Sequence, residues 1–301
     1  MKERVSGLRN RKKFALGCNY LLFLGPALLY FFVIKLTPFL LGIGYSMTDW
    51  NGISKEINFS GFANFRKIFT NDSQFWLSMW FTIKYSLVTV VLSNLAGFTL
   101  AYFLSKNIPC RNVMRSGFYL PNVIGGIVLG FIWQFIYLNV FKSIGDTTGL
   151  GFFQMMWLGT PGTAFWGLAI VEVWKLSGYL MLIYIAGLTT LGKEYIEAAT
   201  IDGANGRQVL RRIIFPLLMP SITQCLFLSI LNTFKVYDVN LALTAGGPFR
   251  SSEAITMNVY QTAFFENQMG LGSAKALILV IFIVVVTQIQ VYVTSKSEVQ
   301  M

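Results

Sequence analysis

Four ionisable side chains stand inside otherwise apolar stretches of this chain. Glu172 and Lys175 are three residues apart, and so are Lys235 and Asp238, so each pair is expected on one face of a helix. A charge at the centre of a bilayer costs at least ~2.5 kcal/mol, and such residues usually face a protein interior or a wet cavity. Two interpretations stay open: the pairs hold two segments together, or they line a path for a polar solute.

Other chemistry is limited by what the sequence lacks. The chain has no histidine, which excludes histidine-based catalytic triads and histidine metal sites. It has no Walker A sequence, so it is not expected to hydrolyse ATP itself. The three cysteines, Cys18, Cys110 and Cys225, form no CxxC pair. We therefore expect that the chain has no catalytic residues and no cofactor or metal site, and that it is not an enzyme.

Composition indicates an all-α polytopic membrane protein. Hydrophobic residues make up 54% and charged residues 12% of the 301 residues, whereas soluble domains have about 25% charged residues. This length predicts a single membrane domain over residues 1–301. Six transmembrane helices are expected, approximately at residues 16–45, 76–104, 115–140, 164–191, 217–243 and 272–294. The third is expected to break early, at Leu120-Pro121-Asn122, and to be loosened by Gly125-Gly126.

The distribution of lysine and arginine predicts the orientation. If the N-terminus is inside, the inner segments hold most of the 24 cationic residues. The outer segments hold only Lys55, Arg66, Lys67, Lys142 and Arg250. The positive-inside rule then places both termini and residues 193–216 in the cytoplasm. The net charge of +11 is thereby explained without a nucleic-acid partner.

Residues 193–216 form the longest polar stretch between two apolar segments. Lys193 to Ile201 predicts a helix, Asp202-Gly203 a turn, and Arg207 to Phe215 a second helix with one apolar face. Pro216 opens the next apolar segment, a natural first-turn position. Such a helix-turn-helix can dock a soluble partner, although an amphipathic linker at the membrane surface is the alternative.

The same stretch resembles a known motif. Glu197-Ala198-Ala199, followed by Gly203, Ile213 and Pro216 at the family's spacing, is similar to the EAA loop of ABC-importer permeases. The resemblance implies that this loop inserts into a groove on a cytoplasmic ATPase. It assigns the coupling role to Glu197, Ala198, Ala199, Asp202, Gly203, Ile213 and Pro216. Residues 243–248, LTAGGP, resemble the turn after the fifth core span of maltose- and glycerol-phosphate-type first permeases.

The resemblance implies a type I ABC-importer permease fold and import of a sugar or oligosaccharide across the inner (plasma) membrane of a bacterium. The implied partners are an ATPase that binds the ATP, an extracytoplasmic substrate-binding protein, membrane lipid and a second permease. The two permeases are expected to form a heterodimer, and a homodimer of this chain is the alternative. An ion-coupled secondary transporter, with the four charges as its coupling site, is the alternative function. It would often show inverted repeats, and no second copy of the 193–216 pattern occurs.

Candidate residues for the substrate pathway combine an aromatic platform with hydrogen-bonding groups. Sugar rings pack their C–H faces on aromatic rings, while their hydroxyls need donors and acceptors. By local match to maltose-type permeases, the resemblance implies a pathway through Asn122, Gly126, Glu172, Trp174, Tyr179, Ser229 and Thr233. Only Trp174 and Tyr179 match in kind, and Glu172 stands where an amide is usual. Core packing or lipid exposure is the alternative for either aromatic ring.

Overall fold

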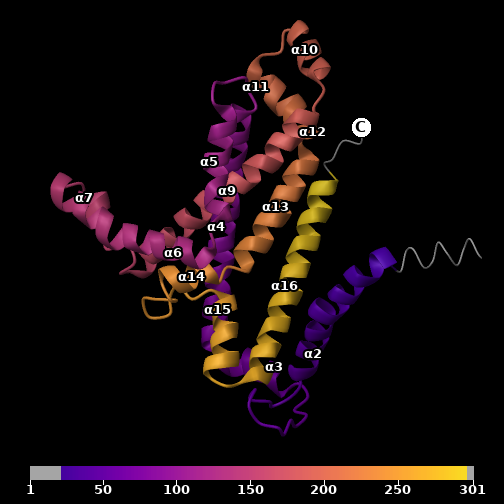
Figure 1. Ribbon diagram of the computed structural model, residues 1–301, viewed down its shortest axis with the longest axis vertical. Coiled ribbons are helices and arrows are strands. Elements are labelled where there is room, and N and C mark those ends of the chain that lie inside the picture. Colours follow the sequence, from indigo (N-terminus) through magenta and orange to yellow (C-terminus); the bar gives the residue numbers. More distant parts are fainter. Residues whose placement is uncertain (1–21, 297–301) are drawn as a thin grey trace, which may run out of the picture.

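The computed structural model describes residues 22–296, and these residues form a bundle of helices (Figure 1). Within this range no β-strand occurs, and one isolated bridge joins Thr48 to Phe59. The predicted all-α class is therefore confirmed. The basic tail at residues 1–13, Cys18 and the first residues of the first predicted span lie outside the described residues.

Five helices in this range are long and apolar enough to cross a membrane. They are Leu22–Tyr45, which ends in η1 (Phe31–Leu36) and α2 (Thr37–Tyr45), then α4 (Ser73–Leu104), Gly126–Thr148, α9 (Pro161–Thr190) and α16 (Met269–Ser295). A bent pair, Gly206–Leu217 and α13 (Met219–Phe234), makes a sixth candidate with an angle of 69° at its break. Short helices α3 (Ala63–Asn71), α15 (Ile255–Tyr260) and η4 (Gln261–Phe265) lie at the end of the bundle opposite α10 (Lys193–Ile201). We call these the α3 end and the α10 end.

The centre of the bundle is the pair α4 and α9, which pack closely along their length. The buried face of α4 carries mainly small side chains, including Ser78, Thr82, Ser86, Thr89, Ser93 and Gly97. A Cβ atom on Gly97 would lie only 3.0 Å from Cβ of Leu180 on α9. Small residues let membrane helices approach closely, because lipid supplies no hydrophobic force that would push larger side chains together.

The third predicted span is two helices that meet at an angle. Pro121 lies inside α5 (Arg111–Val123), and the helix continues past it. The break comes at Ile124 and Gly125, whose ψ angles of 130° and 139° are extended. The chain then resumes as α6 (Gly126–Phe135), η2 (Ile136–Val140) and α7 (Phe141–Thr148), an arm that projects sideways from the bundle (Figure 1).

The arm is held where α6 crosses α14 (Asp238–Leu243). A Cβ atom on Gly126 would lie 2.7 Å from Cβ of Asp238, and one on Gly130 would lie 2.6 Å from Cβ of Ala242. The two helices can approach this closely only because glycine has no side chain. The glycines of the third segment therefore serve packing as well as the change in direction.

The prediction that Lys235 and Asp238 share one helix face is wrong. Helix α13 ends at Phe234, Lys235 is its C-cap, and Asp238 begins α14. The intervening turn is fixed from outside, because the hydroxyl of Thr256 donates a hydrogen bond to the carbonyl of Val236. That contact comes from a residue 20 positions away, so the local pattern could not reveal it.

Candidate functional site

The polar stretch at the α10 end folds into two short helices with a tight turn between them. Helix α10 covers Lys193–Ile201, as predicted, and Gly203 has a φ of +82°. The amides of Gly203 and Ala204 donate to the carbonyls of Thr200 and Ala199, which closes the end of the helix. Glu197, Ala198, Asp202 and Gly203 are exposed, and Ala199 is half-buried. The loop therefore presents its polar residues at the tip of the molecule (Figure 1).

The second half of the loop joins it firmly to the membrane helices. Helix α11 (Gly206–Val209) begins one residue earlier than predicted, because Asn205 and Gln208 form a reciprocal capping box. It continues through η3 (Leu210–Ile214) into α12 (Phe215–Leu217). Ile213 and Pro216 are half-buried there. The ring of Phe215 stacks on Phe98 of α4, with centroids 5.0 Å apart.

Four charged residues of the membrane segments meet around one cavity of about 240 Å³. Its wall includes Glu172 and Lys175 of α9, Gly126 of α6, and Lys235 and Asp238 beside the broken helix. Asn232, Val236, Tyr237 and Val239 complete it. The carboxylate of Glu172 is 1% exposed and lies 3.2 Å from the ammonium of Lys175. Two cations and two carboxylates face this space, so its formal charge is zero.

Five of the seven predicted pathway residues lie away from this cavity. Trp174 is 40% exposed and borders a separate apolar hollow of about 340 Å³. Its ring meets that of Trp133 edge to face, with centroids 5.5 Å apart. Ser229 and Thr233 are fully buried between helices. Of the predicted set, only Gly126 and Glu172 line the charged cavity, while Asn122 and Tyr179 are half-buried elsewhere on α5 and α9.

Ser229 instead belongs to a polar junction of three helices. The amide nitrogen of Asn94 on α4 donates to the hydroxyl of Ser229 on α13 at 3.0 Å. The hydroxyl of Tyr184 on α9 donates to the amide oxygen of Asn94 at 2.8 Å. One asparagine thus joins α4, α9 and α13 between the charged cavity and the α10 end.

A buried charge network at the α3 end was not predicted from the sequence. Lys275 of α16 is 2% exposed, and its ammonium lies 2.7 Å from the carboxylate of Asp72. It also donates to Asn258 at 2.9 Å and to Thr262 at 2.8 Å. The signal was available, because Lys275 is a lysine inside the predicted sixth span.

The network continues through a second buried acid. Glu253 is fully buried and accepts hydrogen bonds from Arg250, from Gln74 at 3.0 Å and from Asn258 at 2.8 Å. The hydrogen bond with Glu253 raises the pKa of the Arg250 guanidinium. These contacts join the start of α4 to α15 and to the loop after α14. Among the described residues, no cluster of His, Cys, Asp or Glu could hold a metal ion.

Comparison with known proteins assigns the family. The profile of the binding-protein-dependent transport system inner membrane component family matches residues 93–298, more than half of the chain. The chain belongs to this family. It is an inner-membrane permease component of an ABC importer.

Similar members of the inner membrane component family include sugar permeases. The chain is 46% identical over 293 residues to the probable starch degradation products transport system permease protein AmyD of Thermoanaerobacterium thermosulfurigenes, covering 97% of this chain and 99% of that protein. It is 30% identical to the multiple sugar-binding transport system permease protein MsmF of Streptococcus mutans, covering 87% and 90%.

A solved structure confirms the permease fold. A chain of the bacterial ABC transporter that imports the acidic polysaccharide alginate superposes with a TM-score of 0.81, over 96% of this chain and 99% of that one. The sequence identity is 18%, so this likeness concerns the fold alone. The predicted importer-permease architecture is thereby confirmed.

Proposed function

We propose that this permease moves a neutral sugar or oligosaccharide inward, together with a separate ATPase, a second permease and an extracytoplasmic binding protein. The observation that carries the proposal is the 46% identity to AmyD across almost the whole chain. That relative is named for starch degradation products, which are uncharged glucose oligomers. The membership in a binding-protein-dependent family favours this function over an ion-coupled secondary transporter.

The exposed loop at the α10 end supports an ATPase partner. Its tip carries Glu197 and the Gly203 turn, while its base packs against α4 through Phe215. Motion of a partner seated on the tip would therefore reach the membrane helices. In this proposal the loop is cytoplasmic, both termini are inside, and the partner binds and hydrolyses the ATP.

Apolar segments with little buried surface support a second permease. Over its most apolar stretch Leu22–Tyr45 has 0% of its residues buried, and Gly126–Thr148 and Met269–Ser295 each have 17%. By contrast, the corresponding stretch of α9 is 61% buried. The side arm and the first helix thus have unpaired surfaces that a related subunit can cover. We propose a heterodimer, and purification of an active transporter lacking any second permease would reject it.

The charged cavity supports an uncharged solute. Glu172 and Lys175 already satisfy one another at 3.2 Å, and Lys235 and Asp238 add one charge of each sign. An anionic or cationic ligand would gain no net attraction from such a wall. Hydroxyl groups, in contrast, can donate to the carboxylates and accept from the ammonium groups.

Uptake by proteoliposomes tests the function. We expect the full importer, with its binding protein, to accumulate radiolabelled maltotriose when ATP is supplied to the ATPase side. The rate should be unchanged by ionophores that collapse proton and sodium gradients. Uptake that requires a gradient and proceeds without ATP would establish the ion-coupled alternative instead.

Replacing Glu172 by Gln should separate transport from folding. The amide is similar in size to the carboxylate and keeps one acceptor, and the Lys175 side chain is 20% exposed, so its charge stays partly solvated and the amount of inserted protein should stay near normal. Lys175 would then have no buried counter-charge, and the cavity would become cationic. We expect maltotriose uptake per inserted molecule to fall about tenfold, which corresponds to about 1.4 kcal/mol. Unchanged uptake would show that this cavity is not on the route.

Trp174→Ala distinguishes the two interpretations of the exposed tryptophan. If the ring stacks on sugar in the assembled importer, transport should fall strongly while the amount of protein stays normal. If it serves only packing against Trp133, the amount of inserted protein should fall instead, because large-to-small changes at packed sites are destabilising. Quantitative immunoblotting and uptake, measured on the same membranes, separate these outcomes.

Reversing the charge at Glu197 should weaken ATPase docking. The carboxylate is exposed at the tip of the loop, so Glu197→Lys should leave folding intact while altering electrostatic complementarity with the partner. We expect less ATPase to co-purify with the permease. Glu56→Lys is the matched control, since Glu56 is an exposed carboxylate on the opposite connection. Equal ATPase recovery from both variants would contradict the docking assignment.

A further inference from the structure

A second cavity, separate from the charged one, lies beside the side arm and has a volume of about 730 Å³. Its wall is built by α6, η2 and α7, by the segment from α8 (Gly151–Gln154) to Gly159, and by the turn at Leu243–Pro248. In the proposed orientation both connections lie on the outer side. The volume falls within the range of about 300–1,000 Å³ that is usual for small-molecule sites.

The rigid part of this wall is aromatic. Tyr137 and Trp157 stack with centroids 5.1 Å apart and an interplanar angle of 16°. The hydroxyl of Tyr137 donates to Gly167, and the indole of Trp157 donates to Phe152. Both side chains are almost fully buried, so they fix the shape of the cavity. Exposed Met155 and half-buried Leu158 and Pro248 supply the accessible apolar surface.

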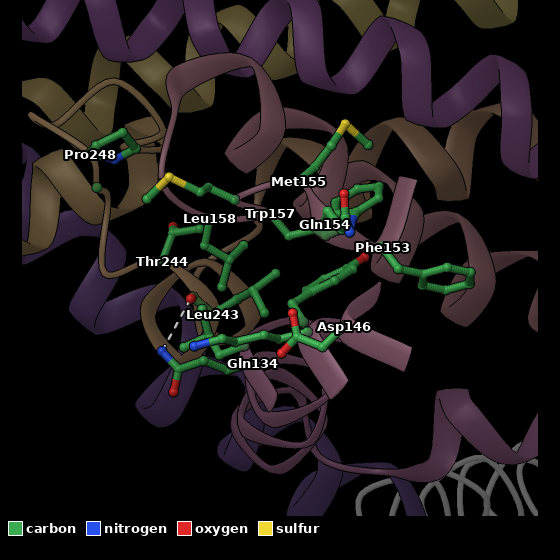
Figure 2. Close-up of a pocket in the computed structure, with 16 residues that line it drawn as sticks. Gln134, Asp146, Phe153, Gln154, Met155, Trp157, Leu158, Leu243, Thr244 and Pro248 are labelled. Carbon is green, nitrogen blue, oxygen red and sulfur yellow. Dashed lines mark hydrogen bonds between the residues drawn. The ribbon is translucent and has the colours of Figure 1, made fainter. Parts of the chain in front are cut away.

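The wall also carries polar groups with unused hydrogen-bonding capacity. Lys142 and Asp146 lie one helical turn apart on α7, both exposed, and neither has an ion-pair or hydrogen-bond partner among the described residues. Gln134 and Gln154 use their amide nitrogens to bind the carbonyls of Leu243 and Gly145. Their amide oxygens remain as acceptors. Figure 2 shows Gln134 and Asp146 on one side of the space, with Leu158 and Met155 on the other.

We propose that this cavity is a second carbohydrate site, outside the charged cavity, that holds one end of a neutral oligosaccharide. The proposal rests on the proposed sugar import. A sugar ring has C–H faces that pack on Met155 and Leu158 and hydroxyls that bond to carboxylate, ammonium and amide groups. One ammonium and one carboxylate cancel, which favours an uncharged ligand over an acidic one. The site would retain a long substrate beside the outer opening.

Direct binding tests the site in the intact importer, reconstituted in nanodiscs without its binding protein. The probe is radiolabelled maltoheptaose. We expect saturable binding that weakens about tenfold in Asp146→Asn, because a hydrogen bond to a charged group is lost, and that disappears in Met155→Trp, which fills the space. Glu56→Gln is the matched control, since it removes an exposed carboxylate that borders no cavity described here, and it should leave the affinity unchanged.

Labelling of Met155→Cys with a water-soluble maleimide, in a variant whose Cys18, Cys110 and Cys225 are replaced by Ser because Cys110 is exposed, identifies the occupant. We expect rapid labelling in the sugar-free importer and slower labelling with maltoheptaose present. Labelling that is blocked without sugar would overturn the proposal, because a segment of the second permease would then fill the cavity. Protection by the binding protein alone would overturn it in favour of a protein-docking site. Binding that is lost in Glu172→Gln but retained in Met155→Trp would assign the sugar to the charged cavity and would also overturn it.

Uptake by the same wild-type preparation, with the binding protein added, separates the two proposals. Normal maltotriose import without maltoheptaose binding at this cavity would overturn the second site and leave the import function standing. Binding that is sensitive to Asp146→Asn, with no import of any neutral sugar, would support the site and reject the import function.

Discussion

Replacing Gly203 by Val should abolish transport while leaving the protein inserted in the membrane. Gly203 has a φ of +82°, and a Cβ atom there would meet nothing within 4 Å. The cost is therefore backbone strain rather than collision, on the order of 1–3 kcal/mol. Relief of that strain would rotate α10 relative to α11. We expect ATP-driven uptake to be lost and the ATPase to be released during purification.

Two controls make the Gly203 result specific. Gly206→Ala also adds a Cβ atom in open space, but Gly206 does not have a positive φ, so its transport should remain near normal. Gly203→Asn should retain much of the activity, because asparagine tolerates the left-handed region better than branched residues. Wild-type uptake in Gly203→Val would show that the conformation of this turn is not needed for coupling.

Replacing Lys275 by Ala should have the largest effect on stability. The ammonium is buried and binds Asp72, Asn258 and Thr262 together. Its removal leaves a carboxylate and two polar groups without their partner. Breaking a buried ion pair in this way typically costs about 3–5 kcal/mol. We expect a large fall in the melting temperature of the detergent-solubilised permease and in its amount in the membrane.

Lys84→Ala is the matched control for this loss. Lys84 is also a lysine of a membrane helix, but it is exposed and lies 5.2 Å from the ring centroid of Trp80. Exposed contacts of this kind contribute about 0.5–1 kcal/mol, so its melting temperature should change little. Equal melting temperatures for the two variants would contradict a stabilising role for the network around Lys275.

The parts of the fold that could be predicted were those determined locally. Helix propensity and the glycine that follows define α10, and its bounds agree with the structure. The break after Phe234 is fixed by a distant contact, through Thr256, and no periodicity within that segment contains this information. The break at Ile124 and Gly125 follows the expected position at Leu120-Pro121-Asn122 by two residues and includes one of the two glycines expected to loosen the span. Long helices with local signals were therefore predicted better than the broken ones.

Among the candidate pathway residues, some positions were predicted correctly from the sequence and others were not. Glu172 was expected at a cavity and lies at one, with Lys175. Trp174 is only two positions further, and residues two apart on a helix point to nearly opposite sides. The helical period alone therefore predicts that Glu172 and Trp174 face different surroundings. On α13, Asn232 rather than Ser229 or Thr233 lines the cavity, because Ser229 is turned toward Asn94 of α4 and Thr233 is fully buried one helical turn further on. That rotation of the helix depends on its neighbours and was not predictable from the segment itself.

The contact with Asn94 divides α13 into two parts of unequal length. Ser229, its contact with Asn94, lies ten residues from Met219 and five from Phe234. At 1.5 Å per residue the two arms are about 15 Å and about 7.5 Å long. A rigid tilt of α13 about this contact would move its two ends in opposite directions, and the α12 end would move about twice as far as the end at the charged cavity. The ratio of these two lengths depends on which residue of α13 contacts Asn94. Moving the hydroxyl from position 229 by one helical turn would therefore change the ratio of the two displacements without changing the residues at either end of the helix.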